Sequence, residues 1–142
     1  MLRLLCVIFS LLPLMALASK ESPFMADVYA LSPAIYDIKS VGSWARGKKE
    51  GQVRLVITRS KKRDDVFLQW VSWDQKGPQK VESTIQVKEI RETANYKITY
   101  VRREKIEGKR QIVLGLENLY DKSVSRAMIQ VIGVGMYGCL VK

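Results

Sequence analysis

The side chains that could do chemistry in this chain of 142 residues are carboxylates and cations, because histidine is absent. Without histidine, the chain cannot build a Ser-His-Asp or Cys-His catalytic pair, or a zinc site of histidine and cysteine. The 14 acidic residues leave catalysis by two carboxylates open, as in glycosidases, but their spacing points to no converging pair. We therefore expect a protein that is not an enzyme and that uses no metal or cofactor.

The two cysteines, Cys6 and Cys139, belong to different parts of the chain. Cys6 lies in an apolar N-terminal segment, so Cys139 stands alone in the remainder. A chain with one such cysteine forms no internal disulfide. Cys139 is then either a small buried hydrophobic side chain or a thiol that pairs with a second copy. A homodimer through Cys139 or through strand edges is therefore an open expectation.

Residues 1–18 have the layout of a cleavable signal peptide. Arg3 supplies positive charge, an apolar run of about 12 residues follows, and Ala16 and Ala18 form a small-x-small cleavage site. The apolar run is short of the ~20 residues that span a bilayer as a helix. We expect cleavage near Ala18-Ser19, export to the periplasm or the cell exterior, and no transmembrane segment.

Short alternating segments dominate the chain from Ala34 onward. Val53, Leu55 and Ile57 lie on one face of the segment 52–60. They alternate with Arg54, Val56 and Thr58, which is the period of a strand. Comparable segments recur between polar or glycine-containing turns. We expect strands near 35–44, 52–60, 66–73, 80–90, 96–102, 112–116 and 128–137. This pattern predicts an all-β fold, either an antiparallel sandwich or a small meander barrel of about seven strands.

Two further features complete the expected organisation. Residues 117–127 have apolar side chains at helical spacing, so they form either a short helix or a loop or strand. Residues 19–33, punctuated by Pro23 and Pro33, are expected to form an N-terminal arm. The predicted domains are thus a signal peptide at 1–18, the arm at 19–33 and a single β domain at 34–142.

The charge is strongly basic, with 24 Lys and Arg against 14 Asp and Glu. Such an excess suits an acidic protein or an anionic envelope surface, although a basic surface can also serve solubility alone. We find no module for specific nucleic-acid binding.

In an up-and-down meander, alternate turns emerge at the same end of a sheet, so the turns near 46–51, 75–80 and 103–110 would cluster. That end, the basic end, would carry ten cations against Glu50, Glu104 and Glu107. The ten are Arg46, Lys48, Lys49, Lys76, Lys80, Arg102, Arg103, Lys105, Lys109 and Arg110. The opposite end, here the far end, would be more balanced: Arg59, Lys61, Lys62, Arg63, Arg91 and Lys122 against Asp64, Asp65, Glu92 and Asp121. A Greek-key topology would scatter these turns.

Tryptophan offers candidate contacts beside these cations. Trp44 and Trp73 adjoin the basic turns, and an exposed indole there could stack on a sugar or a base. Trp70 and Trp73 lie three residues apart on opposite faces of one strand, so one fills the core and the other is either covered by a second layer or exposed.

Gly42-Ser43-Trp44 resembles the G-x-W triplet that lipocalin-like barrels carry near their first strand. A helix before the final strand would fit that family too. The resemblance implies a β-barrel with a small-molecule cavity.

The sequence therefore predicts a non-catalytic binding or interaction protein that uses a basic surface to engage an acidic partner or envelope component. The alternative is a small-molecule carrier with a lipocalin-like barrel cavity.

Overall fold

The computed structural model describes residues 25–73 and 79–142, in two compact units. The first unit ends at Leu31 and contains the short helix α1 (Met25–Tyr29). The second, the β domain, spans Ser32–Lys142. The predicted signal peptide at 1–18 and Lys76 lie outside the described residues. Among the described helices, none has the length and apolar character needed to cross a membrane.

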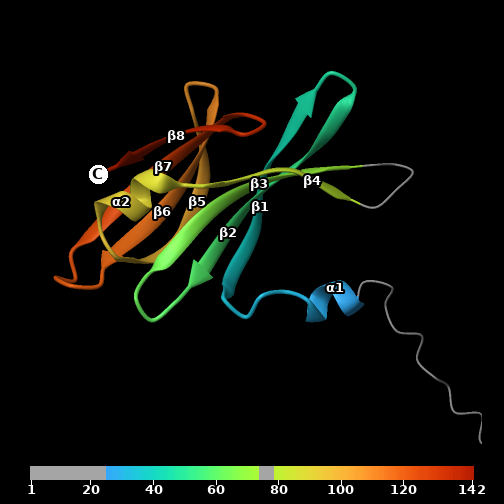
Figure 1. Ribbon diagram of the computed structural model, residues 1–142. Helices are drawn as coiled ribbons and strands as arrows, with labels where there is room; N and C mark the ends of the chain where they lie inside the picture. The colour runs from blue at the N-terminus through green and yellow to red at the C-terminus, as the bar shows by residue number, and fades with distance from the viewer. Residues whose placement is uncertain (1–24, 74–78) are drawn as a thin grey trace, which may run out of the picture. The chain divides into compact units, whose positions relative to one another are not determined.

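The β domain contains two four-stranded antiparallel sheets, each a simple meander (Figure 1). The first sheet has the order β1 (Ile35–Arg46), β2 (Lys49–Arg59), β3 (Asp64–Ser72) and β4 (Lys80–Gln86). The second has the order β5 (Tyr96–Ile106), β6 (Lys109–Asn118), β7 (Val124–Gly133) and β8 (Met136–Val141). The predicted sandwich is therefore confirmed, and the barrel alternative is wrong because the two sheets remain separate instead of closing into one.

The described part of the sandwich has eight strands, where the sequence indicated about seven. The segment expected as one strand at 128–137 is a hairpin, since β7 ends at Gly133 and β8 begins at Met136. Gly135 lies in the connecting turn with a φ of +72°. That conformation is open to glycine at little cost, which is why the chain can reverse here.

A short helix does form, although not at residues 117–127. The expected strand at 80–90 ends at Gln86, and α2 (Lys88–Thr93) follows it with Ile90 buried against the core. A six-residue helix has too few turns to show a clear apolar period in the sequence. The alternation of β4 therefore made the whole segment 80–90 look like one strand.

Residues 119–123 form a loop between β6 and β7. The Asn118 side chain accepts a hydrogen bond from the Tyr120 N–H at 2.9 Å. The Asp121 carboxylate accepts from the N–H of Ser123 at 2.9 Å and from its hydroxyl at 2.6 Å. These hydrogen bonds hold the pKa of Asp121 below its usual value. Side chains that bind nearby backbone groups favour turns over helix, which explains why the helical spacing here does not produce one.

The interior of the sandwich is filled by apolar side chains from both sheets. Val53, Leu55, Ile57, Leu68 and Trp70 come from the first sheet, and Ile98, Ile112, Leu114, Leu116 and Ile129 come from the second; each is at most 2% exposed. Trp70 therefore fills the core, as one of the pair Trp70 and Trp73 was expected to do. Burial of this apolar surface is the main favourable term that holds the sheets together.

One buried carboxylate also joins the two sheets. Asp64 on β3 is 4% exposed and accepts hydrogen bonds from the Arg59 guanidinium at 2.9–3.2 Å. It also accepts the backbone N–H of Ile98 on β5, in the other sheet, at 2.9 Å. The hydrogen bonds to Asp64 raise the pKa of Arg59 above its ordinary value, so the guanidinium keeps its charge. The three donors to Asp64 offset the cost of burying the carboxylate charge.

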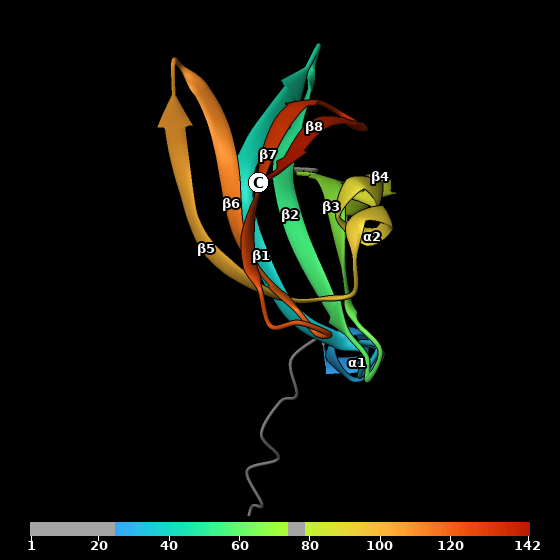
Figure 2. The ribbon, with the colours of Figure 1, turned by 90° about the vertical axis from the view of Figure 1, so that its left-hand side faces the viewer.

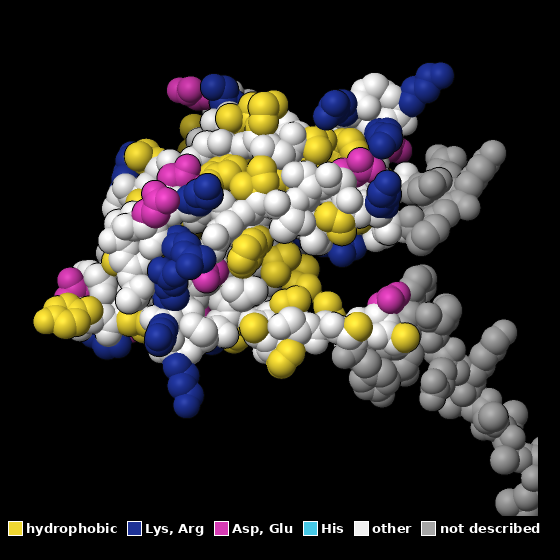
Figure 3. Space-filling model, in the orientation of Figure 1, with side chains coloured by type: hydrophobic (Ala, Val, Ile, Leu, Met, Phe, Trp, Pro, Cys, Tyr) yellow, Lys and Arg dark blue, Asp and Glu magenta, His cyan; other side chains and the backbone are white. Residues whose placement is uncertain are grey.

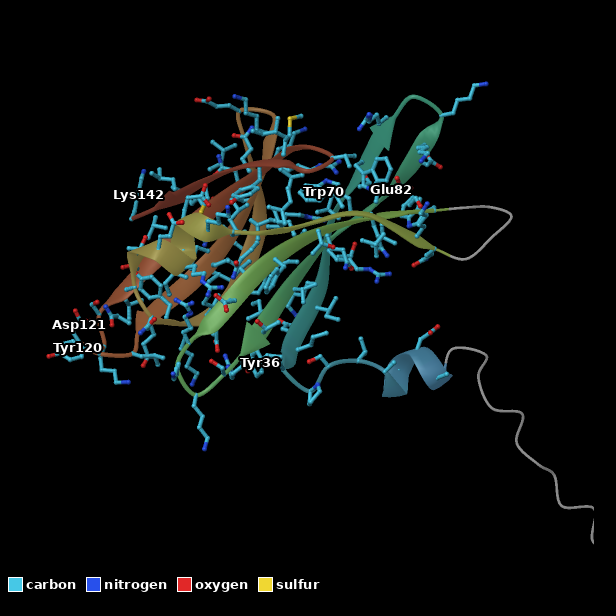
Figure 4. The ribbon with its side chains drawn as sticks, in the orientation of Figure 1. Tyr36, Trp70, Glu82, Tyr120, Asp121 and Lys142 are labelled. Atoms are coloured by element: carbon cyan, nitrogen blue, oxygen red, sulfur yellow. The ribbon has the colours of Figure 1, made fainter. Side chains whose placement is uncertain are left out.

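The meander topology gives the β domain two distinct ends. The β1–β2 and β5–β6 hairpins project in the same direction in both ribbon views (Figures 1 and 2). The β2–β3 and β6–β7 turns lie at the opposite end, where Figure 4 shows Tyr120 and Asp121 at the tip. The Greek-key arrangement that would have scattered these turns is absent from both sheets.

Candidate functional site

Two tight hairpin turns set the geometry of the basic end. Gly47 has a φ of +62° between β1 and β2, and Glu107 and Gly108 have φ values of +49° and +79° between β5 and β6. Two-residue turns with positive φ match the twist of the strands that they join. Because the turns are so short, the cations beside them, including Lys48 and Lys109, are held close to the strand ends.

The two hairpins, which belong to different sheets, come together at this end. Arg110 Nη1 on β6 donates a hydrogen bond to Ser43 Oγ on β1 at 3.5 Å. An open hollow of ≈ 700 Å³ lies beside this contact. Its lining includes Trp44 and Gly51 from the first sheet and Lys109 and Arg110 from the second. The site therefore depends on how the sheets pack, and neither hairpin forms it alone.

Trp73 lies where three such hollows meet. It lines the first hollow and also a second of ≈ 470 Å³, which Arg103, Lys105 and Arg110 share. It lines a third of ≈ 630 Å³ together with Lys48, Lys49 and Lys80. The backbone N–H of Trp73 donates to the Glu50 carbonyl at 2.9 Å, and the residue is 48% exposed. An exposed indole is thus surrounded by cations from both sheets.

Trp44, the other candidate aromatic contact, has a different place. It is 9% exposed and packs in the core, and its indole N–H donates to the Val71 carbonyl at 3.3 Å. Trp44 still contributes to the lining of the first hollow. Trp44 therefore anchors the β1–β2 hairpin, which leaves Trp73 as the exposed indole.

The structure brings most of the predicted cations to this place. Seven of them line the three hollows around Trp73: Lys48, Lys49, Lys80, Arg103, Lys105, Lys109 and Arg110. Arg46 lines a neighbouring hollow with Lys49 and Glu82. Arg102 lines none of these hollows and pairs with Glu104 at 2.8 Å. Figure 3 shows Lys and Arg side chains along the upper edge of the molecule, at the tips of both hairpins.

Few of these cations have an acidic partner. Lys49 pairs with Glu82 at 3.3 Å, and this ammonium group holds the pKa of Glu82 below its usual value. The other six cations around Trp73 form no ion pair with any residue in the described ranges. Because exposed like charges repel one another and attract anions, this arrangement favours a negatively charged ligand.

Sequence reasoning missed Glu82, which Figure 4 shows near the β1–β2 hairpin. Glu82 lies at an irregularity in the pairing of β3 with β4, between the partners of Trp70 and Val71. Lys80 and Glu82, two residues apart on one strand, were a signal that a cation and a carboxylate lie close together. The partner of Glu82 is nevertheless Lys49, 33 residues away, and only the fold reveals it.

The potentially reactive side chains of β8 are held in unreactive forms. Cys139 is a free cysteine that packs against the core, and burial followed by the nearby Glu89 raises its pKa to about 12. Burial also raises the pKa of Tyr137 to about 12, and its hydroxyl donates to Glu89 Oε2 at 2.8 Å. Across the described residues, no three His, Cys, Asp or Glu side chains gather as a metal site would require.

We also compared the chain with known proteins. Neither the models of protein families, nor the curated proteins, nor the solved structures contain a match to this chain.

Proposed function

We propose that this protein is an exported, non-catalytic binding protein whose basic end engages an acidic partner or an anionic envelope component. The observation that supports it is the group of cations around Trp73, drawn from both sheets and mostly without acidic partners. Clustered charge of one sign raises the local concentration of an oppositely charged ligand and speeds its association.

The carrier alternative receives less support from the fold. A carrier needs an enclosed apolar cavity of a few hundred Å³. Between these two sheets the space is occupied by buried side chains, with Trp70 and Leu68 at 0% exposure. The hollows described above open to solvent at the surface and are lined by charged groups, which suits an anionic ligand better than an apolar one.

The proposal is tested with two double variants of equal charge. Lys48→Gln with Lys105→Gln removes exposed, unpaired cations from both hairpins of the basic end. Lys61→Gln with Lys62→Gln removes two exposed lysines from the far end. Affinity for heparin and for phosphatidylglycerol vesicles is measured as a function of salt concentration.

We expect the basic-end variant to bind more weakly and to lower the salt slope of log K by about 2, because each lost contact lowers it by about 1. The far-end variant should retain the slope of the original chain. Equal losses in both variants would mean that net charge alone governs binding, and no binding of the original chain to either anion would contradict the proposal.

Export is tested separately. If the signal peptide is cleaved near Ala18-Ser19, mass spectrometry of the exported protein should give a chain that begins at Ser19. A chain that retains residues 1–18 and stays in the cytoplasm would contradict this part of the proposal.

A further inference from the structure

We propose that the ligand of the basic end is an acidic polysaccharide, with one sugar ring packed on Trp73 and its carboxylate or sulfate groups facing the surrounding cations. This inference rests on the proposed function and specifies its ligand. The three tryptophans differ sharply in exposure. Trp70 is 0% exposed and Trp44 is 9% exposed, whereas Trp73 is 48% exposed. The indole of Trp73 is a large apolar face in contact with water. A ligand that covers this face gains free energy of binding from the buried apolar surface.

The cations lie around Trp73 in more than one hollow. Lys48 and Lys80 line one hollow with it, and Arg103 and Lys105 line another. A ligand that satisfies both groups must present a flat apolar face with negative charges beyond it in more than one direction. A chain of acidic sugars has this chemistry, because each ring has faces that carry C–H groups and its acidic groups project from the rim.

The polar lining of these hollows fits a hydroxyl-rich ligand. Ser40 and Ser43 line the hollow that contains Arg103, and Ser72 and Gln79 line the hollow that contains Lys80. These side chains can donate and accept hydrogen bonds, as sugar hydroxyl groups do. Hollows of ≈ 470 Å³ and ≈ 630 Å³ that share Trp73 also provide room for more than one sugar ring.

A single-stranded nucleic acid fits the site less well. Such ligands are bound by aromatic side chains in succession, one for each stacked base. Among the described residues that line the three hollows, Trp73 is the one exposed aromatic side chain, since Trp44 is buried. A single exposed indole among many cations matches a ligand that packs one ring on Trp73 and presents several anionic groups to the cations.

The inference is tested by comparing three anions: a heparin-derived dodecasaccharide, polyphosphate of similar charge, and an oligothymidylate. Each is titrated against the original chain, Trp73→Ala, Trp73→Phe and, as a control, Tyr120→Ala at the far end. Tyr120 is 96% exposed, so its removal tests the loss of an exposed aromatic side chain elsewhere. We expect Trp73→Ala to weaken dodecasaccharide binding about tenfold, comparable to the loss when a stacked base loses its aromatic partner, and to leave polyphosphate binding unchanged. Trp73→Phe should recover part of the loss, and Tyr120→Ala should have no effect.

Fluorescence gives a second measurement that needs no variant. Because Trp44 and Trp70 are buried, quenching by acrylamide reports mainly on Trp73. The dodecasaccharide should protect this fluorescence, and polyphosphate should protect it much less.

The outcomes separate the two proposals. If all three anions bind through the basic-end cations but Trp73→Ala changes nothing and the fluorescence is not protected, the polysaccharide inference fails and the proposed function stands. If the oligothymidylate depends on Trp73 more strongly than the dodecasaccharide does, the ligand is a nucleic acid and the inference is overturned. If no anion binds, both proposals fail.

Discussion

The two ends of the sandwich use their charged residues in different ways. At the far end, Arg59 pairs with Asp64 at 2.9 Å, Arg63 pairs with Asp65 at 3.7 Å and Lys122 pairs with Glu117 at 3.7 Å. At the basic end, six of the seven cations around Trp73 have no acidic partner among the described residues. Most far-end cations thus have a carboxylate partner within the protein, Lys61 and Lys62 being exposed exceptions, whereas most of the cations around Trp73 have none among the described residues.

This contrast shows that composition does not reveal which cations have a carboxylate partner within the protein and which face solvent. Arg59 and Arg103 are the same residue type, and both adjoin turns in the sequence. Asp64 engages Arg59 through three hydrogen bonds, whereas Arg103 lines an open hollow. The comparison therefore predicts that changes to the paired charges of the far end affect stability, and that changes to the unpaired cations around Trp73 affect binding.

The largest expected effect lies where the basic end touches the core. A Cβ at Gly51 would overlap the Val71 carbonyl oxygen and lie 2.8 Å from Trp44 Nε1. Gly51→Ala should therefore force β2 and β3 apart and lower the free energy of unfolding by about 3 kcal/mol or more. Gly138→Ala, where a Cβ meets nothing within 4 Å, is the matched control and should cost much less. Urea denaturation measures the free energy of unfolding of both variants. Equal decreases in the two variants would show that the close approach of the Val71 carbonyl to Gly51 does not matter for stability.

The next effect tests the far end. Asp64→Ala leaves the Ile98 N–H without its acceptor and Arg59 without its partner, so it should lower the free energy of unfolding by about 2 kcal/mol. Heparin affinity should be unchanged under conditions where the variant is folded. Glu117→Ala removes an exposed pair and should cost well under about 1 kcal/mol. An Asp64→Ala variant that is as stable as the original chain would contradict the role of this carboxylate in joining the sheets.

At the basic end, replacing Glu82 is expected to strengthen anion binding by a small factor. Glu82→Gln removes the carboxylate that neutralises Lys49, so affinity for heparin should rise a few-fold. Glu117→Gln releases Lys122 at the far end and changes the net charge equally, which makes it the control. Both are measured by the salt-dependent titration described above. A rise of the same size in Glu117→Gln would show that position does not matter.

The smallest expected effect is at Cys139. Its thiol packs against the core with a pKa of about 12, so at pH 8 almost none of it is the reactive thiolate. Iodoacetamide should modify the folded chain far more slowly than the unfolded chain. Cys139→Ser should leave the apparent size on a non-reducing gel unchanged. A dimer band that disappears in this variant would instead support pairing between two copies.

Much of the fold could be predicted from the alternation of apolar side chains. Strand period in segments such as 52–60 is a local property, so the all-β class followed from the sequence. The errors occurred where local signals compete. Gly133 and Gly135 suggested irregularities within one strand, but Gly133 ends β7 and Gly135 lies in a hairpin turn. The helix α2 is too short to show a helical period.

The candidate site divides in the same way. The sequence by itself determined the lack of histidine, the excess of cations and their concentration near alternate turns, because these are properties of residue type and order. Only the tertiary structure decided that Trp44 is buried and Trp73 exposed. It also decided that Arg110 donates a hydrogen bond to Ser43 and that Glu82 forms an ion pair with Lys49. These contacts join residues far apart in the chain, and they depend on strand register and on how two sheets pack, which no local pattern specifies.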